Sequence, residues 1–396
     1  MKLKKIVLIL MLGVFATSIF AADVAIDELQ MIDVRSLGMG GTHITDTNDF
    51  YTLFKNPAGL ALTGKKGMIS VITVNVGGPL EKGTTIVKDL NAGKKFDEIL
   101  PNLIKDGLKA NVNVALDGPL CFGGISKNGF GWGFYETVNI DANVPSLTLA
   151  KATAQVEAGL MMGYGFKIDI GAGTSISVGV TADAFAKVPR MAIQDSVANI
   201  ISTVQGKGLD KLPLTAAYGL SCDAGAQVRL FNFIDAAIVW EDFCSPYVTK
   251  DTTLGAVQKD PSVVTPNFKK VKWQSQNFRV GAGVNVLPNG ALGGLISALK
   301  VQADIKDIKL FFRHFIDKKL SSLEKSPWLN FTAGAEVGLM HFIYARVGYH
   351  DGYASVGASI KLGAFNIDAA LYTNELGRKP GANNQMNAAV SVGFHY

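Results

Sequence analysis

The stretch TAQVEAGLMMGYGFKI, residues 153–168, alternates between two kinds of side chain. Its even-numbered positions hold Ala, Val, Leu, Met, Tyr, Phe and Ile, while its odd-numbered positions are mostly Thr, Gln, Glu, Gly and Lys. Successive side chains of a β-strand point to opposite faces, so one face of this segment is apolar and the other polar or small. A membrane-spanning strand needs about 9 to 11 residues of this pattern, with the apolar face toward lipid. The stretch therefore predicts one strand of a transmembrane β-barrel.

The same alternation recurs through the rest of the chain. The last five segments follow one another closely, and one connection is Asp351-Gly352, a dipeptide typical of hairpin turns. We predict an all-β fold, a transmembrane antiparallel β-barrel of about 14 strands, an even number as in bacterial barrels. A soluble sandwich also alternates, but its water-facing side would carry more charge than these glycine- and serine-rich faces. The predicted strands are residues 68–76, 111–125, 130–140, 153–168, 175–183, 218–230, 234–243, 277–286, 300–306, 331–339, 343–350, 353–362, 365–372 and 387–396.

The composition favours a large β-structure. The 396 residues are 48% hydrophobic with a mean hydropathy of +0.23, yet beyond the first 20 residues no uninterrupted apolar run could cross a bilayer as a helix. The 43 glycines and 18% charged residues fit a barrel better than a charged helical protein. On length alone, one large barrel is as plausible as two soluble domains. The net charge of +5 includes three lysines within the first five residues, so we expect no nucleic-acid partner.

The first residues are typical of an export signal. Lys2, Lys4 and Lys5 precede an apolar run over residues 6–20, and Ala21-Ala22 offers a small-residue cleavage site. A membrane anchor is the competing interpretation, but the run is shorter than the ~20 residues of a spanning helix. We expect a signal peptide over residues 1–22, a plug or hatch over residues 23–66 and the barrel over residues 67–396.

Between the signal and the first strand lies the most motif-dense stretch, SLGMGGTHITDTNDFYTLFKNPAGLAL, residues 36–62. Gly38, Gly40 and Gly41 permit a tight turn and a close approach to other backbone, because glycine has no Cβ. Asn56-Pro57-Ala58-Gly59 is a second compact turn, in which Pro57 fixes its own φ and Gly59 lets the chain reverse. The stretch predicts a folded segment that could plug the lumen. Taken alone, the second motif could equally be an ordinary β-turn.

This pairing of a glycine-rich turn with an Asn-Pro-Ala turn resembles the amino-terminal region of the FadL-type outer-membrane transporters of long-chain fatty acids, most closely uncharacterised treponemal FadL-like proteins. In that family the segment forms a hatch inside the barrel, and its Asn-Pro-Ala turn lies near the hydrophobic ligand. The resemblance thus implies ligand or hatch roles for Asn56, Pro57, Ala58 and Gly59, and for the glycine turn. It covers most of the mature chain but is specific only here and, more weakly, in the carboxy-terminal third.

Charged residues with lumen-facing parity are candidates for handling a ligand head group. Most should be paired or hydrated, since a polar interior is normal for a barrel. Arginine is favoured for binding a carboxylate because its guanidinium makes bidentate contacts. We therefore predict Arg229, Arg279 and Arg346 as head-group contacts.

The sequence gives no support for catalysis, a metal or a cofactor. The five histidines are scattered, and there is no phosphate-binding loop, nucleophile elbow or complete dinucleotide-binding fingerprint. Cys121, Cys222 and Cys244 match no metal motif and cannot all pair within the chain. We treat them as small apolar residues, with a disulfide between Cys222 and Cys244 as the lesser alternative.

Helical spacing of apolar residues marks three of the connections predicted to be external: residues 96–104, residues 193–204 and, more weakly, residues 310–323. These helices could pack on the barrel rim. Alternatively, they could form an apolar groove that captures a lipid before it enters the barrel.

The sequence thus predicts passive uptake of a hydrophobic substrate through the outer membrane of a diderm bacterium, and the expected substrate is a long-chain fatty acid. Outer-membrane lipid and the barrel-assembly machinery are the other expected partners, because residues 387–396 end on Tyr396 and look like the assembly signal of such barrels. One rival is a non-transport barrel that serves as a secretion-associated or surface platform for proteins. Another is a soluble periplasmic β-protein.

Overall fold

The computed structural model describes residues 31–46, 49–78, 92, 98, 110–118, 120–146, 148–204, 208–265, 268–287, 295–317 and 325–396. The expected signal peptide and the apolar helical face at residues 96–104 therefore lie outside the described residues, apart from Glu98. Among the described helices, none has the length and apolarity needed to cross a bilayer.

The described strands form a single closed antiparallel sheet of 17 segments. The last segment pairs with the first, for example Asn75 with Ala389, so the sheet has no free edge. Three pairs of consecutive segments, β2 with β3, β8 with β9 and β10 with β11, are each one interrupted strand, which makes a 14-strand barrel. The segments are β1 (Lys66–Gly78), β2 (Ala110–Asp117), β3 (Phe122–Ile125), β4 (Phe130–Ser146), β5 (Leu149–Gly171), β6 (Thr174–Asp195), β7 (Pro213–Leu230), β8 (Ile234–Glu241), β9 (Pro246–Thr253), β10 (Lys272–Trp273), β11 (Asn277–Asn285), β12 (Ile296–Ile305), β13 (Phe331–Leu339), β14 (Ile343–His350), β15 (Tyr353–Leu362), β16 (Phe365–Glu375) and β17 (Asn384–His395).

The predicted fold class and strand order are confirmed, whereas several predicted strand ends were wrong. β5 has 23 residues and β6 has 22, several more than the predicted segments at both places. β9 lies where a long loop was expected, and it carries the exposed, charged sequence around Lys250 and Asp251. Beyond a membrane-spanning belt a strand is free to present polar residues on both faces, so its ends carry no alternation to detect.

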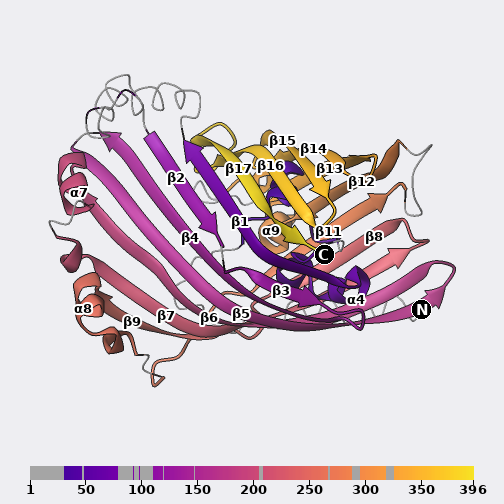
Figure 1. Ribbon diagram of the computed structural model, residues 1–396, viewed down its shortest axis with the longest axis horizontal. Helices are drawn as coiled ribbons and strands as arrows, with labels where there is room; N and C mark the ends of the chain where they lie inside the picture. Colours follow the sequence, from indigo (N-terminus) through magenta and orange to yellow (C-terminus); the bar gives the residue numbers. More distant parts are fainter. Residues whose placement is uncertain are drawn as a thin grey trace.

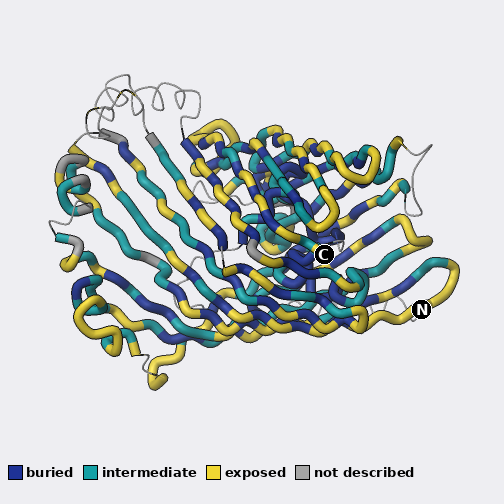
Figure 2. Tube along the Cα trace, viewed as in Figure 1, coloured by how far each residue is buried: buried dark blue, intermediate teal, exposed yellow. Residues whose placement is uncertain are grey.

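Burial alternates along the wall as the sequence predicted (Figure 2). Val178 is 46% exposed and Val180 is 52% exposed, whereas their neighbours Ser177 and Thr181 are 1% and 4% exposed. The same outward apolar row continues on the neighbouring strand with Phe166. The outer surface of the barrel is therefore apolar and its lumen polar, which is the arrangement of a transmembrane barrel.

The chain ahead of β1 folds inside the barrel, and we call residues 31–46 and 49–65 the plug. Figure 1 shows these indigo segments enclosed by the wall. Glycines of the inner wall lie directly against the plug, and Phe50, Met39 and Leu53 are among the largest fully buried side chains. The plug contains α2 (Val34–Gly38), α3 (Thr52–Lys55), the 3-10 turn η1 (Pro57–Gly59) and α4 (Leu60–Thr63).

Apolar plug residues pack onto one side of the lumen. Phe50, Leu53 and Leu60 form a buried cluster with Tyr135 and Met161 of the wall. The ring of Phe54 meets that of Tyr135 edge to face, at 5.5 Å between centroids. Burial of this area against the wall anchors the plug on the side of β4 and β5.

The two ends of the barrel differ in their connections. Short turns join β3 to β4, β5 to β6, β7 to β8, β13 to β14 and β15 to β16, and we call this the turn end. The opposite, loop end carries α7 (Val197–Val204), α8 (Leu254–Lys259) and α9 (Ile308–Asp317), with the 3-10 turns η3 (Leu209–Lys211), η4 (Pro261–Val264) and η5 (Pro327–Leu329). Figure 1 shows α7 and α8 at the ends of β6, β7 and β9. Helix α7 covers residues 197–204 of the predicted stretch 193–204, whose first three residues belong to β6.

Candidate functional site

The glycine turn of the plug, residues 38–41, lies against the inner wall of β13 and β14. Gly40 has a φ of +76°, a conformation that favours glycine. A Cβ at Gly348 would lie 2.2 Å from the Gly40 nitrogen, and a Cβ at Gly334 would lie 2.1 Å from the carbonyl oxygen of Met39. Gly334 and Gly348 are cross-strand partners, so together they make a flat place in the wall for this turn. We call this contact the first seat.

Buried charges surround the first seat. Arg35 of the plug binds Glu336 of β13 through two nitrogens, each 2.9 Å from a carboxylate oxygen. The same guanidinium also pairs with Asp46 and Asp49. On the wall, the Nε of Arg346 lies 2.7 Å from Glu336. Plug and wall therefore share one network of alternating charges, in which Glu336 serves both arginines.

The second plug turn begins at Asn56, which is fully buried. Its side-chain amide donates to the carbonyl oxygen of Ile44 at 2.7 Å and to the side chain of Gln227 on β7 at 2.9 Å. Its side-chain oxygen accepts from the Ala58 nitrogen at 3.0 Å. One amide thus closes the turn, ties it to the rest of the plug and bonds it to the wall.

A row of three wall glycines receives this turn. Gly165, Gly179 and Gly225 are directly paired across β5, β6 and β7. A Cβ at Gly179 would lie 2.1 Å from the carbonyl oxygen of Pro57, and one at Gly225 would lie 2.5 Å from the Oδ1 of Asn56. Any larger residue in this row would displace the turn. We call this contact the second seat.

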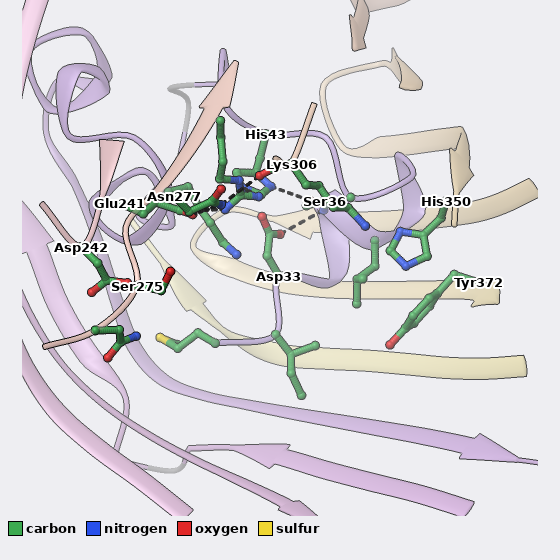
Figure 3. A pocket seen from close by; sticks show the side chains of 17 residues that line it. Asp33, Ser36, His43, Glu241, Asp242, Ser275, Asn277, Lys306, His350 and Tyr372 are labelled. Atoms are coloured by element: carbon green, nitrogen blue, oxygen red, sulfur yellow. Dashed lines mark hydrogen bonds and ion pairs between the residues drawn. The ribbon is translucent and has the colours of Figure 1, made fainter. Parts of the chain in front are cut away.

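On the loop-end side of the plug lies a cavity of about 580 Å³. Asn277 begins β11, His350 ends β14 and Lys306 directly follows β12, so the wall residues around it come from the loop ends of these strands. In Figure 3, Glu241, Asp242 and Asn277 lie on one side of the cavity and His350 and Tyr372 on the other. The lining residues are Met31, Ile32, Asp33, Ser36, Leu37, Gly41, His43, Lys55, Glu241, Asp242, Gln274, Ser275, Asn277, Arg279, Lys306, His350 and Tyr372.

The lining contains one set of basic side chains and one set of apolar side chains. His43, Lys55, Arg279 and Lys306 gather closely enough that the charges of Lys55 and Arg279 lower the pKa of His43, after burial, which lowers it most. Burial and then the charge of Arg279 lower the pKa of Lys55 from 10.5 to about 8. Lys55 is thus held as a cation whose charge is sensitive to pH just above neutrality.

The apolar part of the lining comes from the start of the plug and from β16. Met31, Ile32 and Leu37 face the cavity together with Tyr372. The hydroxyl of Tyr372 donates to Asn75 at 3.0 Å, so its polar end is satisfied within the wall. A molecule in the cavity would meet cations on one side and hydrocarbon and aromatic surface on another.

Acidic groups at the cavity limit its positive charge. Glu241 lies 2.7 Å from an Nη atom of Arg279 and neutralises part of that charge. Asp33 caps α2 by accepting from the Ser36 nitrogen at 3.0 Å. Burial and then the charge of Asp49 raise the pKa of Asp33 to about 7. Near neutral pH the Asp33 carboxyl is therefore only partly ionised.

The three arginines predicted as head-group contacts lie in different places. Arg279 lines the cavity. Arg229 is bound to Asp235 at 2.8 Å near the turn end, away from the cavity. The side chain of Arg346 is 0% exposed within the charge network of the first seat. Only Arg279 of the three borders the cavity, so it alone is positioned for a ligand there.

Of the predicted plug residues, Gly41 lines the cavity, whereas the Asn56 turn lies at the second seat, nearer the turn end. Sequence reasoning missed His43 and Lys55. Both are polar residues in a segment predicted to enter a lumen, and Lys55 directly precedes the Asn56 turn. Within the described part of the chain, no cluster of three or more His, Cys, Asp or Glu side chains is arranged to hold a metal ion.

Several solved structures resemble the chain along most of its length. The toluene transporter TbuX of Ralstonia pickettii is 11% identical, with 92% of this chain and 97% of that chain covered and a TM-score of 0.46. The toluene transporter TodX of Pseudomonas putida is 10% identical, with 94% and 99% covered and a TM-score of 0.43. A FadL homologue of Pseudomonas aeruginosa is 10% identical, with 93% and 98% covered and a TM-score of 0.41.

The last of these is a homologue of FadL, the family that the plug sequence resembles, and at such identities the likeness of all three concerns the fold alone. No protein-family model matches the chain. No curated protein matches it in sequence. The likeness to treponemal proteins stays a prediction.

Proposed function

We propose that the chain is an outer-membrane channel for the passive uptake of hydrophobic molecules that carry an anionic head group, with long-chain fatty acids as the substrate class. The observation that carries this proposal is the cavity of about 580 Å³ above the plug, where Arg279 and Lys55 face the same space as Ile32, Leu37 and Tyr372. A purely hydrocarbon ligand would place apolar surface against these basic side chains, which is unfavourable. A small inorganic anion would make no use of the apolar side.

The outer surface supports a membrane location. Val347 is 59% exposed and Ile360 is 45% exposed, while Ser359, beside Ile360, is 2% exposed. Rows of outward apolar side chains of this kind are costly in water and favourable in lipid. This argues against the rival of a soluble periplasmic protein. The chain acts in this proposal as a channel rather than an enzyme.

The apolar part and the basic part of the lining would each contribute to the free energy of binding. Apolar surface removed from water contributes about 25 cal/mol per Å². A charge-assisted hydrogen bond from Arg279 to a carboxylate adds about 1.5 to 3 kcal/mol. Passage beyond the cavity then requires the plug to shift, and the glycine turn at residues 38–41 and the turn at residues 56–59 are the proposed hinges.

The proposal is tested by equilibrium binding of a fluorescent long-chain fatty acid to the purified barrel in detergent. We expect Arg279→Gln to raise Kd about 10-fold or more. The lost contact contributes about 1.5 to 3 kcal/mol, and a tenfold change in Kd corresponds to about 1.4 kcal/mol. Arg229→Gln is the matched control and should leave Kd unchanged, since Arg229 lies away from the cavity. A long-chain alcohol should bind both variants equally, because it has no charge for Arg279 to recognise.

Equal fatty-acid binding by the Arg279→Gln variant and the unaltered protein would contradict the head-group assignment. If neither lipid binds the folded barrel, uptake itself is contradicted, and the rival of a surface platform for proteins is favoured. Retention of the folded form is checked by comparing the gel migration of boiled and unboiled samples.

A further inference from the structure

Two of the three cysteines lie side by side on the barrel wall. Cys222 belongs to β7, and Cys244 lies in the stretch of residues 242–245 that interrupts the strand formed by β8 and β9. The β7–β9 ladder pairs Gly219 with Tyr247. This ladder ends at that pair and the β7–β8 ladder begins at Ala224 with Trp240, so Cys222 and Cys244 both lie at the break between the two ladders. Facing residues of neighbouring antiparallel strands come within the Cα separation of about 4.4 to 6.8 Å that a disulfide spans.

Hydrogen bonds on both sides of Cys244 hold it against Cys222. The Phe243 nitrogen donates to the carbonyl oxygen of Cys222 at 2.9 Å. The Cys222 nitrogen donates to the Oγ of Ser245 at 3.4 Å. Both cysteines are reduced in the structure, so two facing thiols occupy this place.

The two cysteines lie where the backbone hydrogen-bond ladder of the wall is interrupted. Asp242 has a φ of +55°, unusual for a residue with a side chain, and the ladder between β7 and its neighbour breaks here. Side chains replace the missing ladder bonds: Asp242 accepts from Ser221 at 2.8 Å and from Ser245 at 2.6 Å, and its nitrogen donates to Asp223 at 2.8 Å. Asp242 of this stretch and Glu241, the last residue of β8, both line the cavity.

We propose that Cys222 and Cys244 form a disulfide in the exported protein, and that this bond fastens the interrupted strand to β7 beside the cavity. Each cysteine loses one proton, and the pair gives two electrons to a disulfide-bearing oxidant of the exported compartment by thiol–disulfide exchange. That oxidant is reduced to its dithiol, and one protein S–S bond replaces two S–H bonds. Proteins outside the cytoplasm meet such oxidants, so the inference rests on the proposed export.

Cys121 provides an internal control. It is 0% exposed, and its sulfur contacts the backbone of Glu136 on the neighbouring strand, at 3.4 Å to the nitrogen and 3.5 Å to the oxygen. It therefore stays a thiol while the other two are oxidised.

The test is a thiol count on full-length protein isolated from membranes with N-ethylmaleimide present during lysis and denaturation. We expect one modified cysteine per chain, Cys121, and a non-reduced tryptic peptide pair that joins Cys222 to Cys244. Reduction before alkylation should give three modified cysteines. Maleimide adducts on both Cys222 and Cys244 without prior reduction would overturn the proposal.

Two variants keep the test decisive. Cys121→Ser should leave the joined peptide pair unchanged and abolish all labelling without reduction. Cys244→Ser should give two modified cysteines, because Cys222 then has no neighbour. A joined pair that includes Cys121 in the unaltered protein would show random oxidation, which also overturns the proposal. The count is independent of fatty-acid binding, so failure of the uptake proposal and failure of this inference are distinguishable.

Discussion

The two seats of the plug use the same steric device but differ in what holds them. At each seat, plug backbone lies against wall glycines that are cross-strand partners, Gly334 with Gly348 at the first and Gly165, Gly179 and Gly225 at the second. The first seat is surrounded by a buried charge network. The second is held by a single amide, Asn56, and by neighbouring apolar packing.

The difference shows that steric complementarity and attractive interactions come from different residues of this plug and its wall. Glycines remove the steric obstacle at both seats, but they supply little attraction of their own. A buried ion pair costs about 3 to 5 kcal/mol when one partner is removed, because the other charge stays buried and uncompensated. Loss of a buried neutral hydrogen bond costs about 1 to 3 kcal/mol. We therefore expect the first seat to be the fixed point of the plug and the second to be the part that releases more readily.

The largest effect should come from Glu336→Gln at the first seat. Arg35 and Arg346 would then share less negative charge while remaining buried, so we expect a loss of about 3 to 5 kcal/mol of stability. The measurement is the free energy of unfolding of the barrel in detergent, with Asp235→Asn as the matched control. Asp235 pairs with Arg229, whose side chain is 27% exposed, against 13% for Arg35 and 0% for Arg346, so its loss should cost less. If Glu336→Gln lowers the free energy of unfolding less than Asp235→Asn does, the first seat is not the fixed point of the plug.

A smaller effect is expected when the second seat is altered by replacing Asn56 and Pro57 together with alanine. The turn loses its bonds to Ile44 and Gln227, which should destabilise the plug by about 1 to 3 kcal/mol while the wall stays assembled. Uptake of labelled fatty acid should fall at unchanged surface abundance, because the turn positions the plug. Unchanged uptake would leave this motif as an ordinary turn.

The smallest effect should be a pH dependence at the cavity on the loop-end side of the plug. Asp33 has a raised pKa of about 7 and Lys55 a lowered pKa of about 8, so raising the pH from 6 to 9 ionises the carboxyl and neutralises the amine. Both changes remove positive charge, and an anionic ligand should bind several-fold more weakly at pH 9. An alkyl sulfonate is the suitable probe because it stays ionised throughout. The double variant Asp33→Asn, Lys55→Arg should flatten the profile; a profile as steep as that of the unaltered protein would refute the assignment.

Sequence reasoning predicted the barrel well because its main cause is local. Alternation of apolar and small residues, as in residues 153–168, is imposed on each strand by lipid outside and polar lumen inside, so it is readable one segment at a time. The same reasoning failed at β9 and at the ends of β5 and β6, where no lipid constrains the outer face. It placed Cys222 within a strand, as the structure has it, whereas Cys121, predicted inside the strand of residues 111–125, lies in the interruption between β2 and β3.

The site was predicted less completely. The alternation along each strand places the side chains of Arg229, Arg279 and Arg346 in the lumen. It carries no information on their height along the barrel axis or on their ion-pair partners. The structure pairs Arg229 with Asp235, encloses Arg346 at the first seat and leaves Arg279 at the cavity. His43 and Lys55 come from the plug, whose path has no period, so their meeting with Arg279 was not predictable from spacing.

By itself, the sequence determined the closed antiparallel wall, the face that each strand turns outward and the presence of two turns that can approach other backbone closely. Tertiary structure alone decided where those turns lie. The glycines of the second seat are separated by many residues in the chain and become one row only when β5, β6 and β7 are paired in register. Register and plug path depend on the whole set of contacts at once, because each wall position is matched by plug atoms from a distant segment. Alternation is a property of a few neighbouring residues, whereas a cavity between plug and wall is a property of their assembly.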